Sequence, residues 1–134
     1  MIKLDLPLIN RIEKRNFMVV ERSLDLEINE QHGICMLKGW SVGYERASHY
    51  EEMLSFIETH LEENDRLTAY FGLDFFDKAS LKYLFKIINL LNEKHQKGKK
   101  VNIKWSWRMS SSLMKLSGED FKELSDFPFE IFEE

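Results

Sequence analysis

Residues 66–88, RLTAYFGLDFFDKASLKYLFKII, contain the clearest structural signal in the chain, because a strand pattern gives way there to a helix pattern. Alternate side chains of a strand point to one face, so a strand with one buried side is predicted first. Its apolar residues are Leu67, Ala69, Phe71, Leu73 and Phe75. The carboxylate of Asp77 is suited to cap the helix that follows. The buried stripe of that helix is predicted to consist of Leu81, Leu84, Phe85, Ile88 and Leu91.

The segments before this stretch follow the same two patterns. Residues 24–28 alternate between apolar and polar side chains, residues 30–33 favour a turn, and residues 34–37 form a second apolar run. Together they predict a β-hairpin. Residues 50–61 then have helical spacing, with apolar positions at Tyr50, Met53, Leu54, Ile57 and Leu61.

The segments after this stretch predict one more strand, a helical region and a closing strand. Residues 101–107 alternate, which places Trp105 and Trp107 on the apolar face of a strand. Residues 113–124 favour one helix or two short ones. Pro128 ends this helical region, and residues 129–132 favour a short strand.

The predicted order of elements is strand, strand, helix, strand, helix, strand, helix, strand, which indicates an α/β fold. Right-handed crossovers make most of an approximately five-stranded sheet parallel, and the first hairpin adds an antiparallel edge. Because each strand has one polar side, we expect helices mainly on one face. This layout resembles that of STAS domains. We expect residues 23–134 to form a single domain and residues 1–22 an N-terminal extension, either helical or extended.

The composition gives no support for catalysis, metal binding or membrane insertion. The 134 residues contain a single cysteine, Cys35, and no CxxC, HExxH or glycine-rich nucleotide motif. The four histidines lie far apart along the chain. No apolar run approaches the length of a membrane span or signal peptide. We therefore expect a cytoplasmic protein with no catalytic residues, no metal and no cofactor.

Charge is distributed in blocks along the chain. Residues 23–77 carry 3 basic and 12 acidic side chains, whereas residues 78–108 carry 9 basic and 1 acidic. Lys78, Lys82 and Lys86 are spaced to form a basic row on one helix face. These blocks are compatible with solvated faces that partly cancel, or with an acidic protein partner on the lysine row. Nucleic-acid binding is disfavoured, because the whole chain has a net charge of −4.

Several short motifs resemble those of the SiaC family of regulatory phosphoproteins, in the same order along the chain. The turn at residues 76–82, FDKASLK, is similar to the family's strand-to-helix turn. Residues 98–105, GKKVNIKW, resemble its glycine, basic-apolar strand and tryptophan. Residues 118–121, GEDF, and 128–130, PFE, resemble its closing motifs.

This resemblance implies a bacterial regulator that works by partner switching. In the family, a kinase phosphorylates the turn, a phosphatase reverses the modification, and the unmodified protein binds and activates a diguanylate cyclase. The resemblance assigns partner binding to the turn and helix containing Asp77, Lys78, Ser80, Lys82 and Lys86. The family's phosphoacceptor position falls on Lys78, which carries no hydroxyl group, so the usual phosphorylation site is expected to be lost. Ser80 is the remaining candidate phosphoacceptor in the turn, and capping of the first helical turn is its simpler role.

Two classes of function therefore remain open. The first is a non-enzymatic adaptor in a partner-switch or cyclic-di-GMP pathway, with a homodimer contact on the open sheet face as a further option. The second is a small ligand-binding or catalytic α/β domain with a pocket at the strand ends. The motif order favours the adaptor.

Overall fold

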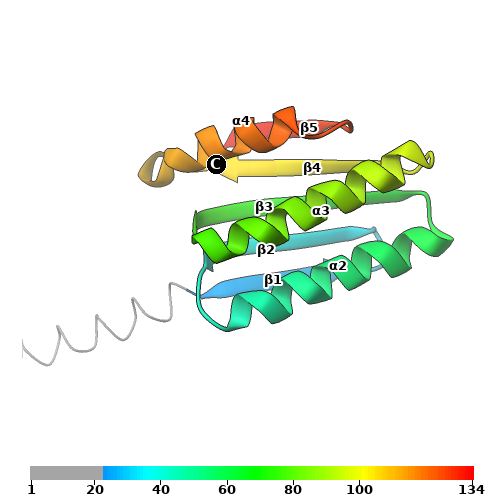
Figure 1. Cartoon of the computed structure of the whole chain (residues 1–134), viewed down its shortest axis with the longest axis horizontal. Helices are drawn as coiled ribbons and strands as arrows, with labels where there is room; N and C mark the ends of the chain where they lie inside the picture. Colours follow the sequence, from blue (N-terminus) through cyan, green and yellow to red (C-terminus); the bar gives the residue numbers. More distant parts are fainter. Residues whose placement is uncertain (1–22) are drawn as a thin grey trace, which may run out of the picture.

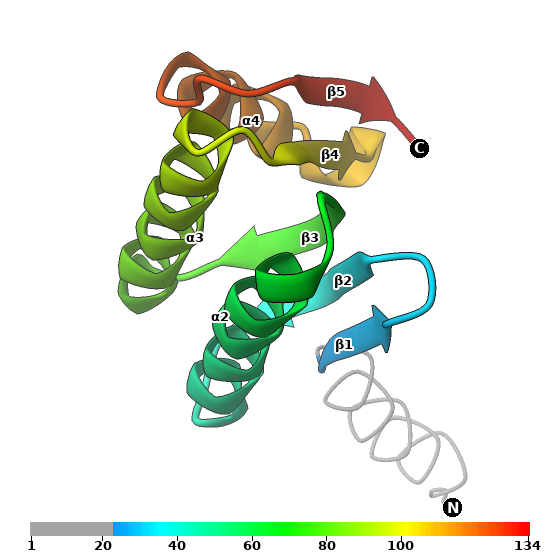
Figure 2. The same ribbon diagram turned by 90° about the vertical axis from the view of Figure 1, so that its right-hand side faces the viewer.

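The computed structural model describes residues 23–134, so the expected N-terminal extension, residues 1–22, lies outside the described residues. A five-stranded sheet forms one layer, and the helices form a second layer on one of its faces (Figures 1 and 2). The elements in chain order are β1 (Leu24–Asn29), β2 (Ile34–Ser41), α2 (Glu45–Glu63), β3 (Arg66–Phe76), α3 (Lys78–Gln96), β4 (Lys100–Trp107), the short 3₁₀ helix η1 (Met109–Ser111), α4 (Leu113–Glu123) and β5 (Phe129–Glu133).

The strands lie in the sheet in the order in which they occur along the chain, β1-β2-β3-β4-β5. β1 pairs antiparallel with β2, and the remaining neighbours pair parallel. Each parallel connection advances the sheet by one strand in the same direction, so right-handed crossovers place all the connecting helices on one face. The predicted mixed sheet, its antiparallel hairpin and its one-sided helical layer are confirmed.

The core fills the space between the sheet and the helices, and Trp105 is its largest buried side chain. The indole lies 5.4 Å from the ring of Phe121 and 5.5 Å from that of Phe71, and its Nε1–H donates to the carbonyl oxygen of Met114 at 2.7 Å. Gly118 of α4 lies directly above this ring. A Cβ atom at residue 118 would stand only 2.5 Å from Trp105 Cδ1. The absence of a side chain at residue 118 is what lets α4 pack onto β4.

The end of β3 differs from the predicted alternation. The pairing of β2 with β3 shifts by one residue, so that Gly39 pairs with Leu73 and Trp40 with Phe75, which leaves Asp74 as an extra residue. Such a bulge exchanges the faces of the residues that follow it. Phe75, predicted on the apolar side, is 41% exposed and packs against Trp40 at 5.4 Å. The side chain that replaces it on the helical side is Phe76, which contacts Phe121.

The stripe predicted for α3 also needs one correction. Phe85 is 39% exposed, whereas Ile87 is fully buried beside Leu84 and Ile88. The residues that enter the core are therefore shifted around the helix from the predicted set. Phe85 still contacts α4, because its ring meets that of Phe121 edge-on at 5.8 Å.

Candidate partner-binding site

The predicted partner-binding turn lies where β2 and β3 end and α3 begins. Asp77 is the N-cap of α3, as predicted, and its Oδ1 accepts a hydrogen bond from the backbone N–H of Ser80 at 2.9 Å. The backbone N–H of Asp77 donates to the carbonyl oxygen of Ser41 at 3.1 Å. The start of α3 is therefore fixed both by its own cap and by the end of the neighbouring strand β2.

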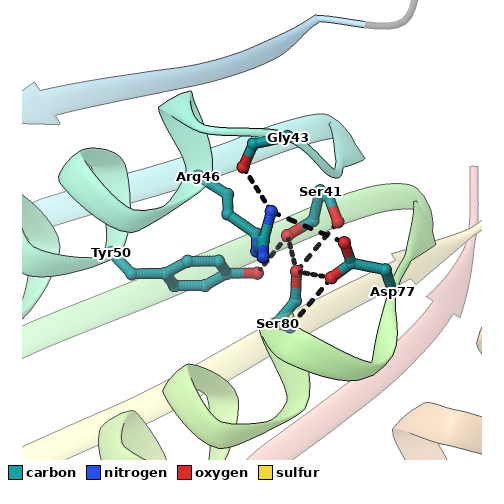
Figure 3. A network of polar contacts seen from close by, with 6 residues as sticks. All are labelled: Ser41, Gly43, Arg46, Tyr50, Asp77 and Ser80. Carbon is teal, nitrogen blue, oxygen red and sulfur yellow. Dashed lines mark hydrogen bonds and ion pairs between the residues drawn. The ribbon is translucent and has the colours of Figure 1, made fainter.

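A chain of hydroxyl groups runs behind this cap (Figure 3). The Tyr50 hydroxyl lies 2.8 Å from Ser41 Oγ, which donates to Ser80 Oγ at 2.7 Å. Ser80 Oγ in turn lies 2.7 Å from Asp77 Oδ1 and 2.8 Å from the Ser41 carbonyl oxygen, two acceptors for its single proton. Because Ser41 donates to Ser80, the Tyr50 hydroxyl is left to donate to Ser41, and the single Ser80 proton is shared between its two acceptors.

Burial makes this polar chain costly to disrupt. Ser41, Tyr50 and Ser80 are fully buried. Burial raises the pKa of the Tyr50 hydroxyl to about 12, although the hydrogen bonds to Ser41 and Ser80 act in the opposite direction. Tyr50 thus stays a neutral donor, and breaking any link would leave a buried group without its partner.

Arg46 connects this network to the loop between β2 and α2. Its Nη1 contacts the carbonyl oxygen of Gly43 and lies 3.5 Å from Asp77 Oδ2, as Figure 3 shows. One oxygen of the Asp77 carboxylate therefore caps α3, and the other lies beside the Arg46 guanidinium group. The Asp77 carboxylate thus joins the loop after β2 to the turn after β3.

The lysine row lies outside the network, on the solvent side of α3. Lys78, Lys82 and Lys86 are all exposed. The Nζ atoms of Lys82 and Lys86 lie 5.3 and 5.5 Å from the ring centre of Tyr83, within the range of cation–π attraction. The ring of Tyr83 also stacks on that of Tyr50, with the ring centres 5.2 Å apart. The lysine row therefore contacts the polar network through Tyr83.

The structure separates the predicted site residues into two groups. Asp77 and the three lysines form one accessible edge, whereas the Ser80 side chain faces inward and is fully buried. Sequence reasoning missed Ser41, Arg46 and Tyr50. Of these three residues, only Ser41 could have been found from its position, because it is a polar residue at the buried end of an apolar strand.

No group of three or more His, Cys, Asp or Glu side chains in residues 23–134 is arranged to hold a metal ion. Cys35 is fully buried, and burial raises the pKa of its thiol to about 12. Its side chain is therefore protonated at neutral pH and unsuited to nucleophilic chemistry. Within the same residues, no helix is long and apolar enough to cross a membrane.

Comparison with known proteins identifies one family whose model matches most of the chain. Residues 21–134 match the model of the SiaC family of regulatory phosphoproteins. The chain belongs to the SiaC family. In this SiaC-family chain, a hydroxyl network lies around the α3 cap, and Lys78 occupies the exposed position after the cap.

One relative is an uncharacterized protein of Pseudomonas aeruginosa strain UCBPP-PA14, 28% identical over 83 residues. The match covers 61% of this chain and 66% of that protein, just under two thirds of its length.

Two solved SiaC structures from Pseudomonas aeruginosa share the fold. One is the diguanylate cyclase SiaD in complex with its activator SiaC, with a TM-score of 0.74, 20% identity, and coverage of 85% of this chain and 94% of the matched chain. The other is apo-SiaC, with a TM-score of 0.73, 23% identity, and coverage of 84% and 92%. At these identities the structural likeness shows the fold alone, while the match to the family model shows the family.

Proposed function

We propose that this SiaC-family protein is a non-enzymatic regulator that binds a diguanylate cyclase through the edge formed by Asp77, Lys78, Lys82 and Lys86. The solved complex of SiaC with the cyclase SiaD supports the choice of partner. The exposed lysine at the start of α3 supports the choice of surface. The partner surface is expected to be acidic, because it must complement three lysines in a row.

The observation that carries this assignment is Lys78 at the first position of α3. The N-terminus of a helix has a partial positive charge, so a lysine there is unfavourable by about 0.3–1 kcal/mol. The acidic group at this helix end is the N-cap Asp77, whose carboxylate is already engaged by the Ser80 N–H and by Arg46. Lys78 has no ion-pair partner among the described residues. Its position is better explained by a contact outside the chain than by the stability of α3.

We further propose that phosphorylation of this turn no longer controls binding. Lys78 occupies the position of the family phosphoacceptor and has an amino group instead of a hydroxyl group that a kinase could phosphorylate. Ser80, the remaining hydroxyl, is fully buried and within 2.8 Å of three oxygen atoms, so a kinase would have to break the network to reach it. Intact-mass measurement of protein isolated from its own cells tests this, and a species carrying one phosphate on Ser80 would contradict it.

The double substitution K78E/K82E is expected to weaken cyclase binding at least about tenfold, because it replaces two attractive charges by repulsive ones. Isothermal titration with a diguanylate cyclase from the same genome measures the binding, and cyclase turnover measures the activation. The matched control is K115E/K122E, which makes the same change in charge on exposed positions of α4.

K115E/K122E is expected to unfold close to the wild-type urea concentration, because both lysines are exposed. K78E/K82E is expected to unfold at the same or a slightly higher concentration, because it removes an unfavourable lysine from the N-terminus of α3. If K78E/K82E bound the cyclase as tightly as the control, the lysine row would not be the binding surface. If the wild-type protein bound no diguanylate cyclase from that genome, the proposed partner class would be wrong.

A further inference from the structure

A second cluster of cations lies at the opposite end of the sheet from Asp77. Arg66 is the first residue of β3 and Lys100 the first of β4, and the two are direct partners in the parallel register. Thr68 and Asn102 are the next pair on the same face. Neighbouring strands lie about 4.8 Å apart, so two positive charges stand side by side here.

This pairing is unfavourable in the protein alone. Like charges directly opposite each other on neighbouring strands destabilise a sheet. Within residues 23–134, neither Arg66 nor Lys100 has an ion-pair partner. Lys104, four residues further along the same face of β4, stands opposite Glu130 of β5 in the parallel register. No acidic residue stands opposite Arg66 or Lys100 in the register of the described strands.

These residues line a cavity of about 550 Å³. Its lining also includes His32, His95 and Lys99, and it contains no aspartate or glutamate. Asp65 lies outside the lining, and its Oδ1 is 3.3 Å from Lys99 Nζ. A larger cavity of about 1130 Å³ has the opposite character, with Glu27, Glu30 and Glu52 in its lining and no lysine or arginine.

One buried polar atom in the cavity wall is also unsatisfied. Asn102 Oδ1 is inaccessible to solvent and accepts no hydrogen bond from residues 23–134. A buried acceptor without a donor costs about 1–3 kcal/mol. A ligand with a hydroxyl or N–H group beside its anionic group would satisfy Asn102 and the cations together, once the Asn102 side chain turns its Oδ1 towards the cavity.

We propose that this cavity binds a small organic phosphate. The phosphate is held between Arg66 and Lys100, where a guanidinium group contacts two of its oxygens, and Asn102 accepts a hydrogen bond from an adjacent hydroxyl group. The cavity volume lies in the range of small-molecule sites. α3 separates this cavity from Lys78 by its full length of 19 residues, so the site is independent of the proposed cyclase surface.

The test is an NMR titration of ¹⁵N-labelled full-length protein at constant ionic strength with ribose 5-phosphate, inorganic phosphate or ribose. Ribose 5-phosphate is expected to give saturable shifts at the Gly33, Thr68 and Gly98 amides, and ribose none. R66Q/K100Q is expected to weaken this binding at least about tenfold. The control K104Q/K122Q removes two exposed lysines outside the cavity and is expected to bind as the wild type does.

The Asn102→Ala variant distinguishes recognition of the hydroxyl group from recognition of the phosphate. It is expected to weaken ribose 5-phosphate binding and to leave inorganic phosphate binding unchanged.

A second measurement needs no ligand. Removal of the like-charge pair in R66Q/K100Q is expected to raise the Tm of the free protein by about 1–4 °C. The proposal is overturned if millimolar ribose 5-phosphate gives no shifts, if R66Q/K100Q binds it as the control does, or if R66Q/K100Q lowers the Tm.

Discussion

Replacement of Ser80 by glutamate is expected to lower the free energy of unfolding by about 3–5 kcal/mol, because it buries a charge without a partner. The introduced carboxylate would lie beside Asp77, whose Oδ1 is 2.7 Å from Ser80 Oγ, and it would break the link from Ser41. Ser80→Ala is expected to cost less, about 1–3 kcal/mol, because it removes a hydrogen-bonding partner without adding charge. Urea denaturation followed by tryptophan fluorescence measures both.

The matched control is Ser55→Glu, which adds the same charge at an exposed position of α2 and is expected to cost only about 0.5–1 kcal/mol, through repulsion from the neighbouring glutamates of the helix. The pH dependence gives a second check. Burial and the neighbouring Asp77 carboxylate raise the pKa of the introduced carboxyl group above its unfolded value, so the deficit of Ser80→Glu shrinks as pH falls. A Ser80→Glu variant as stable as Ser55→Glu at neutral pH would mean that the network tolerates an anion.

Gly118→Ala is expected to lower the free energy of unfolding by about 2–3 kcal/mol, although alanine is a better helix former than glycine by about 1 kcal/mol. The added Cβ would stand 2.5 Å from Trp105 Cδ1 and 2.7 Å from Nε1. The indole cannot move away easily, because it is buried among aromatic rings and bonded to Met114. Either α4 shifts away from β4 or the core rearranges.

A double-mutant cycle with Trp105→Phe isolates this contact. The smaller ring leaves space for the methyl group, so Gly118→Ala is expected to cost at least about 1 kcal/mol less in that background. Ser117→Ala, in the same helix but away from the indole, is the control for helix propensity. An increase in stability from Gly118→Ala in the wild-type background would contradict the packing role of Gly118.

The fold was predictable because its signals are local. Alternation in β3 and β4, helical spacing in α2 and the Asp77 cap each depend on a few neighbouring residues, and all were located from sequence. The prediction errors occur where the pairing of strands in the folded protein overrides the local sequence pattern. The bulge at Asp74 depends on how β2 aligns with β3, and no pattern within β3 indicates that Phe75 and Phe76 exchange faces.

The candidate site was predictable only in its exposed part. Asp77 and the lysines lie close together in sequence, so their spacing is sufficient to place them. The buried part joins Ser41, Tyr50 and Ser80, which are 9 to 39 residues apart. The repulsive pair Arg66 and Lys100 likewise becomes visible only once the register of two strands is known.

The order of strands in the sheet, identical to their order in the chain, has a consequence for how the protein folds during synthesis. Each strand pairs with the strand made just before it, so no segment has to wait for a distant partner. The parallel partners still lie 34 residues apart at Ile34–Thr68 and at Arg66–Lys100, so each strand–helix–strand crossover must be complete before its pair can form. The sheet can therefore grow from the β1–β2 hairpin one strand and helix at a time as the chain leaves the ribosome. Trp105 is the exception, because it stays uncovered until α4 has emerged, and this interval is the point at which a nascent chain most needs protection from aggregation.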